Sequence, residues 1–188
     1  MEALHDVVKS GKARYIGASS MWAWRFAKMQ RAAERGGWTR FVSMQNHYNL
    51  IYREEEREMI PLCRAEGIGI IPWSPLARGF LAGNRVAQGK QGETTRAKSD
   101  DFAQSMYFEP EDFAVVERVK QVAAQLSVKP AQVALAWVAS RPGITAPIIG
   151  ATKPNHLKDA VEALDLVFEI GDVSALEEPY RPHKVLGT

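Results

Sequence analysis

Four short apolar runs decide the fold of this chain: ARYIGAS (Ala13–Ser19), FVSMQN (Phe41–Asn46), IGIIPWS (Ile68–Ser74) and PIIGA (Pro147–Ala151). Each run ends in polar or small residues. The first three begin at positions 13, 41 and 68, and a helical pattern fills the intervals between them. This repeat is typical of βα units in a parallel sheet, whose strands are covered on both faces and read as continuous apolar runs.

A closed (β/α)8 barrel contains eight such units in about 250 residues. The chain has 188 residues and four candidate strands. We therefore expect one α/β unit over residues 1–188 that corresponds to half of a barrel. Apolar periodicity, glycine stops and N-terminal prolines predict helices at Met1–Lys9, Trp22–Arg35, Glu111–Ser127, Pro130–Ser140 and Pro154–Leu164.

The composition is that of an ordinary globular protein, with 46% apolar and 24% charged residues. A net charge of +2 with interspersed signs argues against nucleic-acid and membrane partners. The single cysteine, Cys63, has no intramolecular disulfide partner and indicates a reducing compartment. There is no apolar run long enough to span a membrane, and the N-terminus lacks the apolar core of a signal peptide. These features predict a cytoplasmic protein.

The longest irregular stretch is residues 75–110, rich in Gly, Gln, Thr, Ser and Asp. A loop of this length in a compact domain is usually either a functional lid or a disordered segment.

In parallel barrels the functional surface lies at the carboxyl ends of the strands. Reading those ends selects Ser19 and Ser20, then Gln45 and Asn46, then Trp73. The serines suit ligand contact or capping of the next helix. The amide pair suits a planar carboxamide ligand or ordinary turn chemistry. The tryptophan suits a stacking platform or the core.

The fourth run points to an anion. Gly150 and Thr152 are small residues at the strand end, and Pro154 then begins a helix whose free N–H groups favour negative charge. Lys153 and His156 add basic side chains to the first turn. Phosphate is the expected ligand, and a tight turn with a solvated lysine is the alternative.

No constellation for covalent, hydrolytic or metal chemistry emerges. The four histidines lie in separate units without metal-ligand spacing, and we expect no metal site. Neither a G-x-S-x-G elbow nor a P-loop is present. His47 and Tyr48 have the side chains of an acid pair, but adjacency in sequence says nothing about their reach.

Taken together, four segments resemble the C-terminal half of the aldo-keto reductase family, in the bacterial branch related to potassium-channel β-subunits and aryl-alcohol dehydrogenases. The segments are GKARYIGASS, FVSMQNHYNL, GIGIIPWSPLARGFLAG and PIIGATKPNHLKDAVEAL, in family order and spacing. The resemblance implies strands 5–8, with their helices, of a (β/α)8 TIM barrel. It also implies an NADP-dependent oxidoreductase that reduces small aldehydes or ketones by hydride transfer.

The resemblance also implies roles for individual residues. Ser19 and Gln45 would hold the nicotinamide carboxamide of NADP(H). The pyrophosphate would be lined by Trp73, Ser74, Pro75, Leu76 and Arg78, beneath the cofactor-covering loop 75–110. The adenosine 2′-phosphate end would be surrounded by Gly150, Thr152, Lys153, His156 and Asp159. His156 stands where glutamine is common, and Ala160 stands where asparagine often contacts adenine, which implies looser adenine binding.

In this family a tyrosine donates the proton to the carbonyl oxygen, tuned by a lysine and an aspartate, while a histidine orients the substrate. These four residues belong to the first four βα units, so no residue of this chain takes a catalytic role by position. The alternatives are a non-catalytic NADP(H)-binding half-barrel and a truncated gene product. Because a half-barrel leaves two open sheet edges, we expect closure by a second copy, as a homodimer, or by the missing N-terminal half.

Overall fold

The computed structural model describes residues 1–83, 106–107 and 109–185. Three strands form a parallel sheet in the order β1-β2-β3: β1 is Ile16–Ser19, β2 is Phe41–Gln45 and β3 is Gly69–Ile70. This confirms the expected α/β fold with a parallel sheet, built from the first three predicted runs. The strands are shorter than predicted.

Helices connect and flank these strands much as the periodicity predicted. Pro110, Pro130 and Pro154 each begin a helix, where the lack of an N–H carries no cost. The α-helices are α1 (Glu2–Lys9), α2 (Ala23–Gly36), α3 (Met59–Ala65), α6 (Pro110–Gln125), α7 (Pro130–Ser140), α8 (Pro154–Glu162) and α9 (Ile170–Glu177). The short 3-10 helices are η1 (Glu54–Glu56), η2 (Ala77–Ala82) and η3 (Ala163–Asp165).

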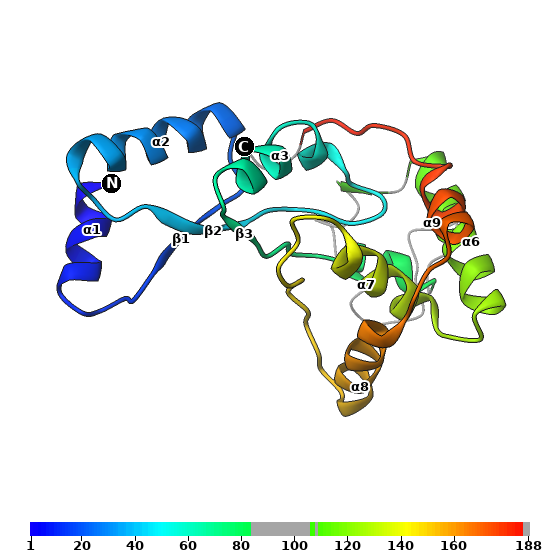
Figure 1. The fold of residues 1–188 in the computed structure, drawn as a ribbon. Helices are drawn as coiled ribbons and strands as arrows, with labels where there is room; N and C mark the ends of the chain where they lie inside the picture. Colours follow the sequence, from blue (N-terminus) through cyan, green and yellow to red (C-terminus); the bar gives the residue numbers. More distant parts are fainter. Residues whose placement is uncertain (84–105, 108, 186–188) are drawn as a thin grey trace.

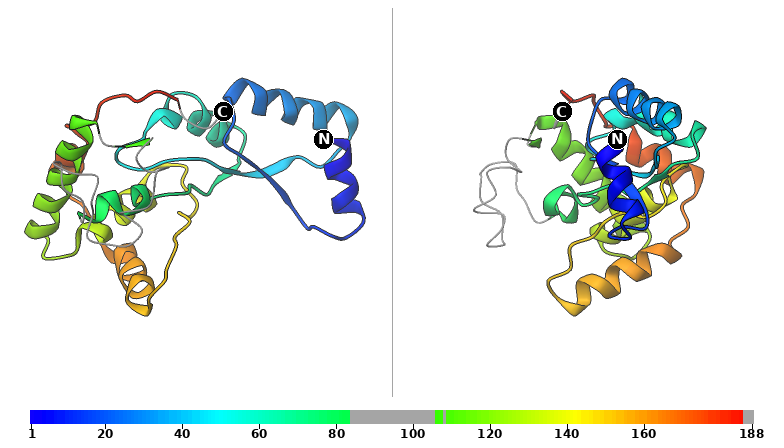
Figure 2. Two further views of the ribbon diagram at one scale, coloured as in Figure 1. Left: turned by 180° about the vertical axis from the view of Figure 1, so that it is seen from behind. Right: turned by 90° about the vertical axis from the view of Figure 1, so that its left-hand side faces the viewer.

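The molecule is elongated (Figure 1). The helices α1 and α2 lie with β1 at one end, and α6, α8 and α9 lie at the other, around α7. Seen from behind, α8 again projects from the rest of the chain (Figure 2). The apolar core joins these parts through buried residues of the sheet, α3, α6 and α7.

The predicted fourth strand, Pro147–Ala151, is wrong as a strand. The chain from Ile144 to Ile148 runs beside β3 but makes only a bridge between Ile70 and Ile144 and scattered bonds, such as Ile148 N–H to the Pro72 carbonyl at 2.8 Å. Prolines on both segments explain this, because each removes a ladder donor. In place of the four expected strands, the described residues form a three-stranded sheet with a loosely attached fourth segment.

Several large apolar side chains remain exposed at the two ends of this sheet. Near β1 they belong to α1 and the neighbouring strands. Near the fourth segment they lie along α8 and the residues after it, where Leu157, Val161 and Leu164 follow one another at helical spacing. Nine-tenths of Ile170 is exposed. These surfaces flank the sheet edges that the sequence predicted to be open.

An aromatic and ionic cluster ties the loop after β2 to the C-terminal helices. Glu177 of α9 accepts hydrogen bonds from the indole of Trp137 and from Arg141, both at 2.9 Å, and pairs with Arg53 at 3.1 Å. The two guanidinium groups lie 5.3 and 5.2 Å from the centre of the buried Trp137 ring, within cation–π range. One carboxylate therefore pairs with two cations and accepts a hydrogen bond from a buried indole.

Within the described residues, no helix is both long and apolar enough to cross a membrane.

The Glu177 cluster predicts a large stability effect. Replacing Glu177 with Ala should lower the free energy of unfolding by about 3 kcal/mol, because it leaves the partly buried Arg141 and the Trp137 indole N–H without their shared acceptor. Urea unfolding followed by tryptophan fluorescence measures this. Lys158→Ala is the control, since its exposed pair with Glu162 should contribute less than about 0.5 kcal/mol. Equal losses in the two variants would contradict the assignment.

Candidate functional site

The carboxyl ends of the three strands meet at one edge of the sheet. The Ser19 hydroxyl donates to the Gln45 carbonyl at 2.9 Å, and the Ser20 N–H donates to the same oxygen at 3.0 Å. The Trp73 indole N–H donates to the Ser20 hydroxyl at 3.3 Å. We call Ser19, Ser20, Gln45 and Trp73 the strand-end cluster. The sequence predicted this meeting, because parallel strands end at the same side.

The structure bears on helix capping by the two serines and on the burial of Trp73. The helix α2 has Trp22 as its N-cap residue and no side-chain cap hydrogen bond, so helix capping by Ser19 or Ser20 is wrong. Trp73 is half-buried rather than a core residue. Ser19 is exposed and Gln45 half-buried, so both remain accessible at the strand ends. Their predicted roles in binding a carboxamide stay predictions.

A buried histidine packs against the ring of Trp73. The His47 ring stacks between the rings of Tyr52 and Trp73, with centroid distances of 4.2 and 4.3 Å and interplanar angles of 14° and 13°. Its Nε2 lies 2.5 Å from the Tyr107 hydroxyl. Burial, followed by the charge of His183, lowers the pKa of His47 to about 3. His47 is therefore a neutral imidazole at physiological pH.

His47 and Tyr48 do not form an acid pair. Tyr48 points to other partners: its hydroxyl donates to Glu56 at 2.6 Å and its ring packs 5.4 Å from that of Trp137. Burial, with the Glu56 carboxylate, raises the pKa of Tyr48 far above its usual value. Neighbours in an extended segment alternate sides, which explains why the two rings part.

Residues 74–79 form a tight turn after the third strand end. Ser74, Ala77 and Arg78 all have left-handed backbone conformations, with φ of 55°, 47° and 55°. Leu76 is the N-cap of η2 and, like Ile149, packs against the small apolar cluster of Leu135, Ala136 and Ala163. Pro75, which lies between Ser74 and Leu76 in the sequence, is buried. The predicted pyrophosphate contacts thus lie on one compact turn that links the strand-end cluster to the segment before α8. Of the predicted covering loop 75–110, residues 84–105 and 108 lie outside the described residues.

The predicted phosphate end lies on an exposed surface. Gly150, Thr152, Lys153 and His156 are all exposed at the start of α8, and Lys153 is an N-cap residue without a side-chain cap hydrogen bond. A side chain at Gly150 would meet no atom within 4 Å, which leaves room over the backbone. An uncapped helix start with two basic side chains and open space fits a phosphate group.

Asp159 stands apart from this group. Its carboxylate pairs with Lys129 at 2.6 Å and is largely covered. The ion pair joins α8 to the N-terminus of α7, so this predicted cofactor residue already has a partner within the chain. Its role toward a ligand stays a prediction.

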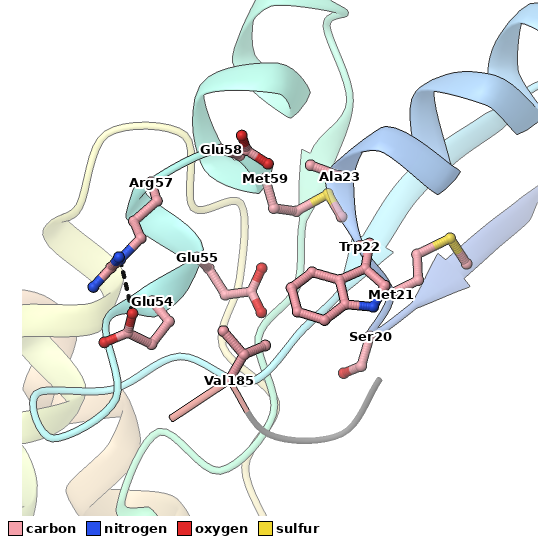
Figure 3. A pocket seen from close by; sticks show the side chains of 10 residues that line it. All are labelled: Ser20, Met21, Trp22, Ala23, Glu54, Glu55, Arg57, Glu58, Met59 and Val185. Atoms are coloured by element: carbon pink, nitrogen blue, oxygen red, sulfur yellow. Dashed lines mark ion pairs between the residues drawn. The ribbon is translucent and has the colours of Figure 1, made fainter. Parts of the chain in front are cut away.

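A separate pocket of about 170 Å³ opens beside the strand ends (Figure 3). It lies between the start of α2 and the η1–α3 segment, and it shares Ser20 with the strand-end cluster. Burial raises the pKa of Glu55, whose carboxylate points toward Trp22. The lining residues are Ser20, Met21, Trp22, Ala23, Glu54, Glu55, Arg57, Glu58, Met59 and Val185. Three carboxylates make this pocket unsuited to a phosphate.

The buried Asn49 lies among the polar residues after the second predicted strand, but the sequence assigned it no role. Its amide nitrogen donates to the Ser74 carbonyl at 2.9 Å and lies 3.2 Å from His47 Nε2 and 3.3 Å from the Tyr107 hydroxyl. The available signal was three polar residues, Asn46, His47 and Asn49, inside an apolar stretch. Among the described residues, no group of three His, Cys, Asp or Glu side chains could hold a metal ion.

Comparison with known proteins identifies the lineage. The sequence model of the Aldo/keto reductase family matches residues 1–181. The chain belongs to this family. It is 46% identical over 187 residues to a putative aryl-alcohol dehydrogenase of Schizosaccharomyces pombe, covering 100% of this chain and 52% of that protein. It is 45% identical over 185 residues to versiconal hemiacetal acetate reductase of Aspergillus parasiticus, covering 98% and 53%. The chain therefore spans about half the length of these relatives.

Two histidines of this aldo/keto reductase chain should shape its stability against pH in opposite directions. His47 has a lowered pKa, so its contribution is present above pH 6.5 and is lost as pH falls toward 3. His183 has a raised pKa because its imidazole bonds Asp112 at 2.8 Å, so its contribution is present below 6.5 and is lost as pH rises above that value.

Urea unfolding from about pH 4 to 9 measures the free energy of unfolding on both sides of pH 6.5. His47→Gln should reduce its fall on the acid side, which amounts to about 3 kcal/mol between pH 6.5 and about 4. His183→Gln should reduce its fall on the alkaline side alone. Unchanged slopes in both variants would contradict the assignment.

Proposed function

We propose that this chain is the NADP(H)-binding half of an aldo/keto reductase barrel and serves an NADP-dependent oxidoreductase that reduces aldehydes or ketones. Family membership gives the reaction class. The observation that carries the proposal is the strand-end cluster, in which exposed Ser19 and half-buried Gln45 and Trp73 meet at one edge. The names of the relatives, an aryl-alcohol dehydrogenase and a hemiacetal acetate reductase, support carbonyl or alcohol substrates.

In this proposal the chain's residues bind and orient the nucleotide. Ser19 and Gln45 hold the carboxamide, and the turn from Trp73 to Arg78 lines the pyrophosphate. Lys153 and His156 at the start of α8, with Gly150 and Thr152, receive the 2′-phosphate. When bound, NADPH supplies the hydride for carbonyl reduction.

The proton for the carbonyl oxygen must come from elsewhere. An effective general acid has a pKa near the working pH. Burial raises the pKa values of Tyr48, Tyr107 and Tyr180 well above their usual range, and the buried His47 is neutral. These observations favour a second reading, in which this chain alone binds the nucleotide without reducing a substrate. A second copy would close the sheet edges but duplicate the same residues, whereas the other half of the barrel would bring the acid.

Fluorescence titration of the 188-residue chain with NADPH and NADH, together with its mass in solution, tests the proposal. Saturable binding with preference for NADPH is expected. Lys153→Ala should weaken NADPH binding about tenfold and change NADH binding little, because only NADPH carries the 2′-phosphate. Lys158→Ala is the matched control, an exposed lysine on the same helix. No saturable binding, or equal effects of the two substitutions, would contradict the proposal.

A further inference from the structure

We propose that Asn49 is a positioning residue for nucleotide binding, holding His47, Tyr107 and the Ser74 carbonyl in one arrangement and thereby setting the place of Trp73. This inference rests on the proposed function for its effect on NADPH, although the arrangement itself is independent of any ligand. Asn49 is fully buried and lies beyond the end of β2, outside the predicted binding set.

The orientation of the Asn49 amide is fixed by the backbone. Its Oδ1 accepts hydrogen bonds from the N–H groups of Ile51 and Tyr52, at 2.9 and 3.0 Å. Only the oxygen of an amide can accept from both, so the NH2 group must face the opposite way. Its two hydrogens then serve the Ser74 carbonyl and the space shared by His47 and Tyr107.

This orientation directs a donor toward the pair of His47 and Tyr107. The second Asn49 hydrogen is within reach of His47 Nε2, at 3.2 Å, and of the Tyr107 hydroxyl, at 3.3 Å. These two groups bond each other at 2.5 Å, so the three side chains hold one another in place. The His47 ring lies flat against Trp73 at 4.3 Å, and Asn49 therefore acts on the indole through His47.

Asn49 also holds the next residue of the predicted site. Ser74 has φ of 55°, a left-handed conformation that is unfavourable for a non-glycine residue. Such a conformation persists only where the surroundings fix it. The Ser74 carbonyl accepts from Asn49 at 2.9 Å and from the Ala77 N–H at 2.9 Å. The same amide thus fixes both the Trp73 ring and the start of the following turn.

The isosteric substitution Asn49→Asp isolates this role. It keeps an oxygen for Ile51 and Tyr52 but places an acceptor opposite the Ser74 carbonyl and His47 Nε2. We expect the dissociation constant for NADPH to rise at least about fivefold. We also expect the ring-nitrogen NMR shifts of His47 to change, because an acceptor replaces the donor beside Nε2. Gln121→Glu, the same chemical change at an exposed position of α6, is the control and should alter neither.

The outcomes separate this inference from the proposed function. Unchanged ring-nitrogen shifts of His47 in Asn49→Asp, or a change in NADPH affinity below fivefold with wild-type binding intact, overturns it. If the wild-type chain binds no NADPH, the proposed function fails, and the indole N–H resonance of Trp73 decides the positioning role. Movement of that resonance in Asn49→Asp but not in Gln121→Glu supports the role, and no movement overturns it. Should Asn49→Asp fail to fold, Tyr107→Phe removes the hydroxyl that His47 and Asn49 both contact and is read by the same criteria.

Discussion

The segment that follows β2 is the point on which the rest of the structure depends. In thirteen residues, from Gln45 at the end of β2 to Arg57, it bonds to β1, to the turn after β3 and to the C-terminal part of the chain. The Gln45 carbonyl accepts hydrogen bonds from Ser19 and Ser20 at the end of β1. Asn49 donates to the Ser74 carbonyl in the turn after β3. The end of the segment reaches the C-terminal helices, where Arg53 pairs with Glu177 and Glu54 accepts from Tyr180. In a parallel sheet the chain must leave the carboxyl end of one strand and cross back before it begins the next. Here the crossing segment forms hydrogen bonds or ion pairs with three neighbouring segments.

The local features of the fold could be predicted from the sequence because they depend on near neighbours. Apolar runs, N-terminal prolines and glycine stops placed three strands and the helices close to where they lie. The fourth run misled because Pro147 and Pro72 remove donors that a continuous ladder needs, which the apolar pattern does not reveal. The strand-end cluster was predictable from parallel topology. The hydrogen-bonded group of His47, Asn49 and Tyr107 could not be predicted, because Tyr107 lies 60 residues from His47 and no periodicity links them.

The two ends of the candidate site are held in different ways. At the strand ends, the polar groups are ordered by bonds within the chain, and His47 already supports the Trp73 ring. At the start of α8, the basic side chains are exposed, and the helix is attached through Ala160, which packs against the small apolar cluster on α7 and η3, and through the pair of Asp159 with Lys129. A preorganised end loses little entropy on binding, whereas an exposed end must order its side chains around the ligand. Orientation of a nucleotide would therefore come from the strand ends, and the α8 end would contribute charge.

This division bears on the relation between family membership and activity. Positioning a nucleotide requires donors, a ring face and an anion site, and each has candidates on this chain. Delivering a proton to a carbonyl requires an acid with an accessible proton. Burial between two aromatic rings lowers the pKa of His47 and keeps it neutral, and burial raises the pKa values of Tyr48 and Tyr107. These groups serve as fixed donors and acceptors within the fold because burial suppresses their titration. The burial that orders these residues also makes them poor acids, so under the proposed function binding and proton transfer would fall to different parts of a complete barrel.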